Sequence, residues 1–235
     1  MKRVDTPELL DSDVCSPEDV QESLRDLGRI NRWFGGVATT QTLIERVAQV
    51  IGRCHFSMLE VAAWTGEVAQ IVQDKLARRG ITLDITLLDQ AWSHLPKLSP
   101  PASDRLKRGR VIVADGLALP FRNSAFDLVS CNLFAHHLEP STLTRFAVEA
   151  LRVSRVAVLI NDLVRHPLHL ALVYAGFPLM RSAVSRVDGL ASVRRAYVPG
   201  EMREILSSRA ESDRKVEISQ HFLFRMGVIV WKGNF

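Results

Sequence analysis

The spacing of apolar residues along the chain predicts strands that alternate with helices. Short apolar runs of strand length recur, and between them apolar residues return every three or four positions, as on one face of a helix. The predicted strands cover 56–61, 83–88, 110–114, 126–131 and 155–160, followed by 215–220 and 222–231 as a final hairpin. Alternation of this kind is typical of parallel βαβ units, so we expect an α/β fold with an open, twisted sheet.

Helices are predicted at 17–33, 41–51, 66–79, 141–153 and 199–208. Ser16 followed by Pro17 marks a helix start, because serine is a good N-cap and proline fits the first turn. The residues before this helix, 1–16, are polar and acidic and are expected to be loose.

Between 163 and 198 the alternation stops, and apolar stretches, prolines and arginines take its place. We interpret this segment as a helical insertion that caps the carboxyl edge of the sheet. Its apolar part, 168–180, is too short for a membrane span, and a helix on a membrane surface is the second interpretation. We expect residues 1–50 to form an N-terminal helical lid and 51–235 to form the main domain.

Composition restricts the class of protein. A length of 235 residues suits one α/β domain with an elaboration. The net charge of +4 does not argue for a nucleic-acid partner. The first 16 residues lack an apolar signal-peptide core, and the three scattered cysteines show neither metal spacing nor a disulfide framework, so a cytoplasmic location is expected. Nothing in the sequence indicates the oligomeric state.

Polar residues that could bind a ligand or take part in a reaction follow the predicted strands. Ligands of open α/β sheets bind at the carboxyl ends of the strands. The residues at these ends are Glu60 and Gly66, then Asp89 and Gln90, Asp115 and Gly116, Asn132 with His136 and His137, and finally Asn161 and Asp162. An acid after the second strand suits a ribose diol, because a carboxylate accepts two hydroxyl hydrogen bonds, and an acid after the third suits an adenine amino group.

Each of these features also has a plainer interpretation. Asp89 and Asp115, taken singly, are more often turn or capping residues than ligands. The pair His136 and His137, taken alone, fits a helix edge with satisfied hydrogen bonds. No metal site is expected, because two adjacent histidines should diverge and the sequence places no third ligand nearby.

Several motifs resemble the class I S-adenosylmethionine-dependent methyltransferases, over about residues 51–164. EVAAWTG (60–66) lies on that family's acidic, glycine-rich first motif, and Asp89 lies on its ribose-binding acid. ADGLALPF (114–121) and SAFDLV (124–129) resemble its third and fourth strand region. The resemblance implies a Rossmann-like sheet of seven strands, with the last antiparallel, and S-adenosylmethionine as cofactor. The cofactor would lie against Glu60, Ala62, Trp64, Gly66, Asp89, Gln90, Asp115, Gly116 and Asn132.

Other motifs narrow the resemblance. LFAHHL (133–138) is similar to a segment of the subgroup that includes quinone-biosynthesis methyltransferases. RINRWFGG (29–36), INDL (160–163) and DGLASVRRAY (188–197) resemble bacterial methyltransferases found beside type III polyketide synthases. This implies methyl transfer to a small, largely apolar acceptor in secondary metabolism, with a phenolic or polyketide hydroxyl favoured. His137 or His136 would be the base, because imidazole titrates near neutrality, and Asp162 is the second candidate base or an orienting group.

The first motif departs from the family pattern, which has glycine at the positions of Ala62 and Trp64. The tryptophan ring must turn away or fill the space of the cofactor's amino-acid end. An alternative is therefore a protein that keeps the fold, has lost the cofactor and serves as a binding or scaffold subunit. A nicotinamide dehydrogenase is disfavoured, because no GxGxxG follows the first strand.

Overall fold

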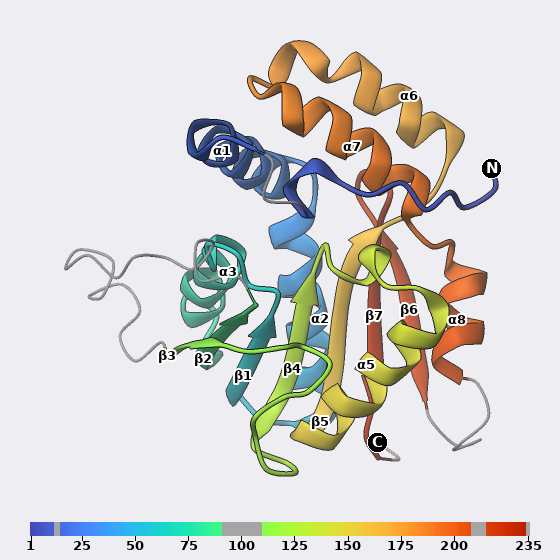
Figure 1. Cartoon of the computed structure of the whole chain (residues 1–235). Coiled ribbons are helices and arrows are strands. Elements are labelled where there is room, and N and C mark those ends of the chain that lie inside the picture. The colour runs from blue at the N-terminus through green and yellow to red at the C-terminus, as the bar shows by residue number, and fades with distance from the viewer. Residues whose placement is uncertain (12–14, 91–109, 208–214, 234–235) are drawn as a thin grey trace.

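The computed structural model describes residues 1–11, 15–90, 110–207 and 215–233. This part of the chain contains a seven-stranded sheet with the order β3-β2-β1-β4-β5-β7-β6 (Figure 1). The strands are β1 (His55–Val61), β2 (Thr82–Asp89), β3 (Arg110–Val113), β4 (Phe126–Asn132), β5 (Ser154–Leu163), β6 (Val216–His221) and β7 (Arg225–Trp231). β1 to β5 pair in parallel, whereas β7 runs antiparallel to both β5 and β6. The predicted Rossmann-like α/β fold with an antiparallel last strand is confirmed.

Helices cover both faces of the sheet. α2 (Gly36–Ile51) packs beside α3 (Glu67–Ala77), and α5 (Pro140–Val153) packs beside α8 (Pro199–Ser207). Met58 belongs to the core under α2 and α3, and the next residue, Leu59, belongs to the core under α5. Successive strand side chains point to opposite faces, so both faces of β1 are buried. This explains why the strands appear in the sequence as continuous apolar runs.

β5 is longer than predicted, because Asn161 and Asp162 continue the strand instead of ending it. They pair with Gly227 and Met226 of β7, which extends the ladder beyond the apolar run. Asn161 is buried and its Nδ2 donates to Gly36 O at 2.7 Å and to Thr40 Oγ1 at 2.8 Å. A polar residue that is satisfied by distant partners can lie inside a strand.

The same contact explains why α2 begins at Gly36 and not at residue 41. Two glycines and two threonines precede residue 41, yet Thr39 and Thr40 are buried in the first turns of the helix. Gly35 caps the helix with a φ of +84°, a conformation that favours glycine.

The insertion contains α6 (Pro167–Ala175), the 3-10 turn η3 (Phe177–Leu179) and α7 (Ala183–Arg195). Together with α1 (Pro17–Trp33), these helices lie over the carboxyl ends of the parallel strands (Figure 1). None of the helices within the described ranges is both long enough and apolar enough to cross a membrane.

The N-terminal segment also runs across this end of the molecule (Figure 1). The backbone N–H of Val4 donates to Arg194 O at 3.2 Å, and the N–H groups of Leu9 and Leu10 donate to the Asp188 carboxylate. Residues 1–11 are therefore fixed on α7, contrary to the loose segment expected from their polarity. Their hydrogen bonds are made to residues distant in sequence, which local composition cannot reveal.

Candidate functional site

A mostly apolar cavity of about 410 Å³ lies at the carboxyl edge of the sheet. Its walls come from α1, the turn after β1, the segment after β4, α6 and α7, and include Leu27, Ala62, Trp64, Leu133, Leu172 and Val193. This is the edge at which open α/β sheets bind ligands, and the size suits a small molecule.

The turn after β1 keeps a backbone that glycine usually adopts. Ala62 has a φ of +54°, Trp64 of +49° and Gly66 of +66°. The N–H of Trp64 donates to Asp89 Oδ2 at 2.9 Å, which ties the turn to the end of β2. A Cβ on Gly66 would overlap the end of the buried Leu87 side chain, so a larger residue there would force Leu87 to move. Ala62 and Trp64 therefore adopt a left-handed backbone although neither is a glycine.

Trp64 is half-buried and lines the cavity together with Ala62. Trp64 therefore borders the space that a ligand could occupy.

Two buried residues of the cavity wall, Glu60 and Asn132, each carry one oxygen atom without a protein donor among the described residues. Glu60 is 3% exposed, and burial raises the pKa of its carboxyl to about 7 although a hydrogen bond with Ser130 acts in the opposite direction. Within the described part of the chain, no hydrogen-bond donor reaches Oε2 of Glu60 or Oδ1 of Asn132. Both residues line the cavity. Buried acceptors are costly when unpaired, so these two atoms fit the donor groups of a bound molecule.

Four other predicted cofactor residues lie outside the cavity lining: Asp89, Gln90, Asp115 and Gly116. Asp89 is buried behind the turn, and Gln90 is exposed just before the segment 91–109, which lies outside the described residues. Asp115 is exposed and its Oδ1 accepts the N–H of Leu117 at 2.9 Å, the turn geometry of the plainer interpretation. Their binding roles stay predictions.

The short 3-10 turn η2 (Ala135–His137) carries both candidate histidines. Nδ1 of His136 lies 2.6 Å from Asp162 Oδ1, and its backbone N–H donates to Asp162 Oδ2 at 3.0 Å. Burial opposes a charge on His136, but the carboxylates of Asp162 and Glu8 outweigh it and raise the pKa of His136 to about 10. Asp162, which is also buried, has its pKa lowered by the same pairing. Asp162 is absent from the cavity lining and contacts His136, a geometry that fits the predicted orienting role, which stays a prediction.

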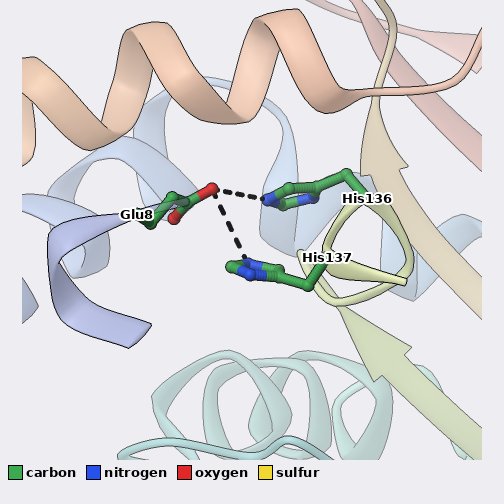
Figure 2. A group of neighbouring side chains, drawn as sticks. All are labelled: Glu8, His136 and His137. Atoms are coloured by element: carbon green, nitrogen blue, oxygen red, sulfur yellow. Dashed lines mark ion pairs between the residues drawn. The ribbon is translucent and has the colours of Figure 1, made fainter. Parts of the chain in front are cut away.

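Glu8 is the site residue that the sequence did not indicate. Its Oε1 lies 3.3 Å from Nε2 of His136 and 3.8 Å from Nε2 of His137, and Figure 2 shows both rings turned toward it. His137 Nδ1 lies 3.1 Å from Asp11 Oδ2. The expectation that adjacent histidines diverge without a third partner is wrong, because η2 directs both rings to the N-terminal segment. Glu8 is remote in sequence and belongs to no recognisable motif, so no local signal could have found it.

Comparison with known proteins agrees with this geometry. Residues 59–157 match the methyltransferase domain family. No curated protein sequence matches the chain. A SAM-dependent methyltransferase from Aquifex aeolicus has the same fold, with a TM-score of 0.60 at 14% identity over 92% of this chain and 98% of that one. The plantazolicin methyltransferase BpumL, solved with a pentazolic desmethylPZN analog and SAH, reaches 0.67 at 12% identity over 93% and 92%.

A third similar structure is a putative O-methyltransferase from Nostoc punctiforme, with a TM-score of 0.54 at 14% identity over 87% of this chain and 59% of that one. At these identities the structural likeness shows the fold alone, and the similarity in sequence to methyltransferase domains is limited to residues 59–157. The domain match covers residues 59–157, and the described part of the chain has the fold of these solved methyltransferases.

Proposed function

We propose that this protein transfers the methyl group of S-adenosylmethionine to a hydroxyl of a small, largely apolar acceptor, of the phenolic or polyketide class. The observation that carries the proposal is that the first-motif turn and the histidine pair line one cavity. Methyl transfer from a sulfonium needs an aligned acceptor and a place for its proton, and this cavity offers both.

The cofactor side of the cavity is the wall made by Glu60, Trp64 and Asn132. The unpaired oxygens of Glu60 and Asn132 suit the ammonium group at the amino-acid end of S-adenosylmethionine, because an ammonium offers three donors and no acceptor. Trp64 borders the same space, so we expect the cofactor to bind, but less tightly than it would beside a glycine. The retained backbone of the turn favours an enzyme over a scaffold subunit.

The acceptor side is the wall made by α1, α6 and α7. Leu172, Val173, Leu179 and Met180 line it, and apolar walls with few polar groups suit an aromatic acceptor. In this proposal residues 1–50 supply a lid through α1, and 163–198 form the cap.

Activation of the acceptor hydroxyl is assigned to the histidine pair. His137 lines the cavity and is the proposed base, while His136, held by Asp162, is protonated near neutral pH and would stabilise the oxyanion. In the reaction the oxygen forms the new bond to the methyl carbon, the sulfur keeps the electron pair of the broken bond, and the hydroxyl proton passes to the base.

The test is transfer of a radiolabelled methyl group from S-adenosylmethionine to a panel of phenols and matched thiols and amines. We expect label on the phenols, and a loss of about 10²-fold or more in His137→Gln, because a general base contributes roughly that factor. His55→Gln, at the exposed start of β1, is the control and should keep full activity. Label on amines alone would refute the hydroxyl assignment, and no turnover together with no cofactor binding would support the scaffold alternative.

A further inference from the structure

Three groups of metal-ligand type converge beside the cavity: the carboxylate of Glu8 and the imidazoles of His136 and His137 (Figure 2). One ligand atom from each lies within 4.8 Å of the others. The distances from Glu8 Oε1 to the two Nε2 atoms, 3.3 and 3.8 Å, exceed the about 2.7–2.9 Å of a charge-assisted hydrogen bond. Ligand atoms around a four-coordinate zinc ion, with bonds of about 2.0–2.1 Å, lie roughly 3.4 Å apart. The two Glu8–His distances therefore fit an ion between the groups better than direct bonds.

The opposite side of each histidine ring is held by a carboxylate. Nδ1 of His136 lies 2.6 Å from Asp162, and Nδ1 of His137 lies 3.1 Å from Asp11. Metal-binding histidines almost always donate their second ring N–H to such a partner, which fixes the ring and leaves the other nitrogen for the ion. Glu8 is supported in the same way, because Ser192 Oγ donates to its Oε1 at 2.7 Å. All three groups are oriented before any ion binds.

The charges around the rings favour a cation. Three carboxylates, those of Glu8, Asp11 and Asp162, surround the two imidazoles, and the Arg195 guanidinium lies 3.1 Å from Asp11. Glu8 and Asp162 are buried, and buried carboxylates are stable only when a positive charge or hydrogen bonds offset them, whereas Asp11 is exposed. Nε2 of His136 is buried and, among the residues described, meets no hydrogen-bond partner. One divalent ion would both use this nitrogen and balance the excess of acidic groups.

We propose that Glu8, His136 and His137 bind one divalent ion of the zinc class, with its remaining coordination position open to the cavity. Two histidines and one carboxylate form the donor set of several catalytic zinc sites, which keep the fourth position for water or substrate. The inference goes beyond the proposed function and would replace its account of activation, because an ion on Nε2 of His136 must displace the proton that this nitrogen otherwise carries. A cation at this place would stabilise the negative charge on an acceptor oxygen. Because a ligating Nε2 cannot also accept a proton, the ion would replace His137 as the activating group.

The test is direct metal binding by the full-length protein after chelator treatment. Zn²⁺ is titrated by calorimetry, and Co²⁺ is titrated by visible absorption, which reports the coordination geometry. We expect one ion per chain, and a loss of affinity of at least tenfold in Glu8→Gln and of about 10- to 100-fold in Asp162→Asn. His55→Gln removes an exposed histidine 3.4 Å from Asp84 and is the matched control, with unchanged affinity.

Wild-type protein that binds no Zn²⁺, or binding that is unchanged in Glu8→Gln, would overturn the proposal. Circular dichroism reports whether each variant folds, and Asp11→Asn tests the His137 side if Glu8→Gln does not fold. The same samples are titrated with S-adenosylhomocysteine. Cofactor binding without Zn²⁺ binding would reject the metal site and leave the proposed function intact, whereas the reverse would reject the cofactor assignment alone.

Discussion

Burial of Glu60 makes the stability of this protein depend on pH in a defined window. The pKa of this carboxyl is about 7 in the folded protein, against an ordinary value of 4.5, because burial penalises its charged form. The folded state therefore holds the proton more strongly than the unfolded state. The resulting stability is fully present below about pH 4.5 and is lost as the pH rises to about 7, and the loss amounts to about 3 kcal/mol.

The perturbation is Glu60→Gln, which keeps the shape of the side chain and removes its titration. Urea unfolding is measured from pH 4.5 to 8 for wild type and variant, and the other titrating groups cancel in the difference. As the pH rises from 4.5 to 8, the free energy of unfolding of wild type should fall by about 3 kcal/mol more than that of the variant. Glu204→Gln, exposed on α8, is the control and should follow wild type. Parallel pH profiles of wild type and Glu60→Gln would refute the reasoning.

Three further predictions concern the turn after β1. Asp89→Ala should weaken S-adenosylhomocysteine binding by about 1–3 kcal/mol, because it removes the predicted partner of the ribose and the acceptor of the Trp64 N–H. Unchanged affinity by calorimetry would refute the ribose assignment. Trp64→Gly should tighten that binding in paired titrations, and a wild type that binds as strongly as the variant would contradict this. Gly66→Ala should lower the free energy of unfolding by about 1–3 kcal/mol more than Gly80→Ala. Both glycines have positive φ, but only a Cβ at Gly66 would meet the Leu87 side chain. Equal losses of stability in urea unfolding would contradict this clash.

The sheet could be predicted from sequence because parallel strands buried on both faces form continuous apolar runs bounded by turn residues. The prediction failed where tertiary contacts satisfy polar residues. Asn161 and Thr40 bond each other across β5 and α2, so neither ends its element. Periodicity reports which residues are apolar, and it carries no information on which polar residues find partners.

Some residues of the candidate site could likewise be predicted from the sequence, and others could not. The first-motif turn and the histidine pair were found because their residues adjoin predicted strand ends, and the structure brings Glu60, Trp64 and His137 to one cavity. Glu8 was missed because the N-terminal segment reaches the site through tertiary contacts, among them those with α7 and η2, that are distant in sequence. Predictions from strand ends therefore find the groups that the sheet presents, and miss those that a distant segment adds.

The central claim, that the cavity holds S-adenosylmethionine, is tested most directly by calorimetric titration of the wild-type protein with S-adenosylhomocysteine. We predict saturable binding of one molecule per chain, weaker than the binding of Trp64→Gly and reduced by removal of the Glu60 carboxylate or the Asn132 amide. An absence of binding in both wild type and Trp64→Gly, with both proteins folded by circular dichroism, would contradict the claim.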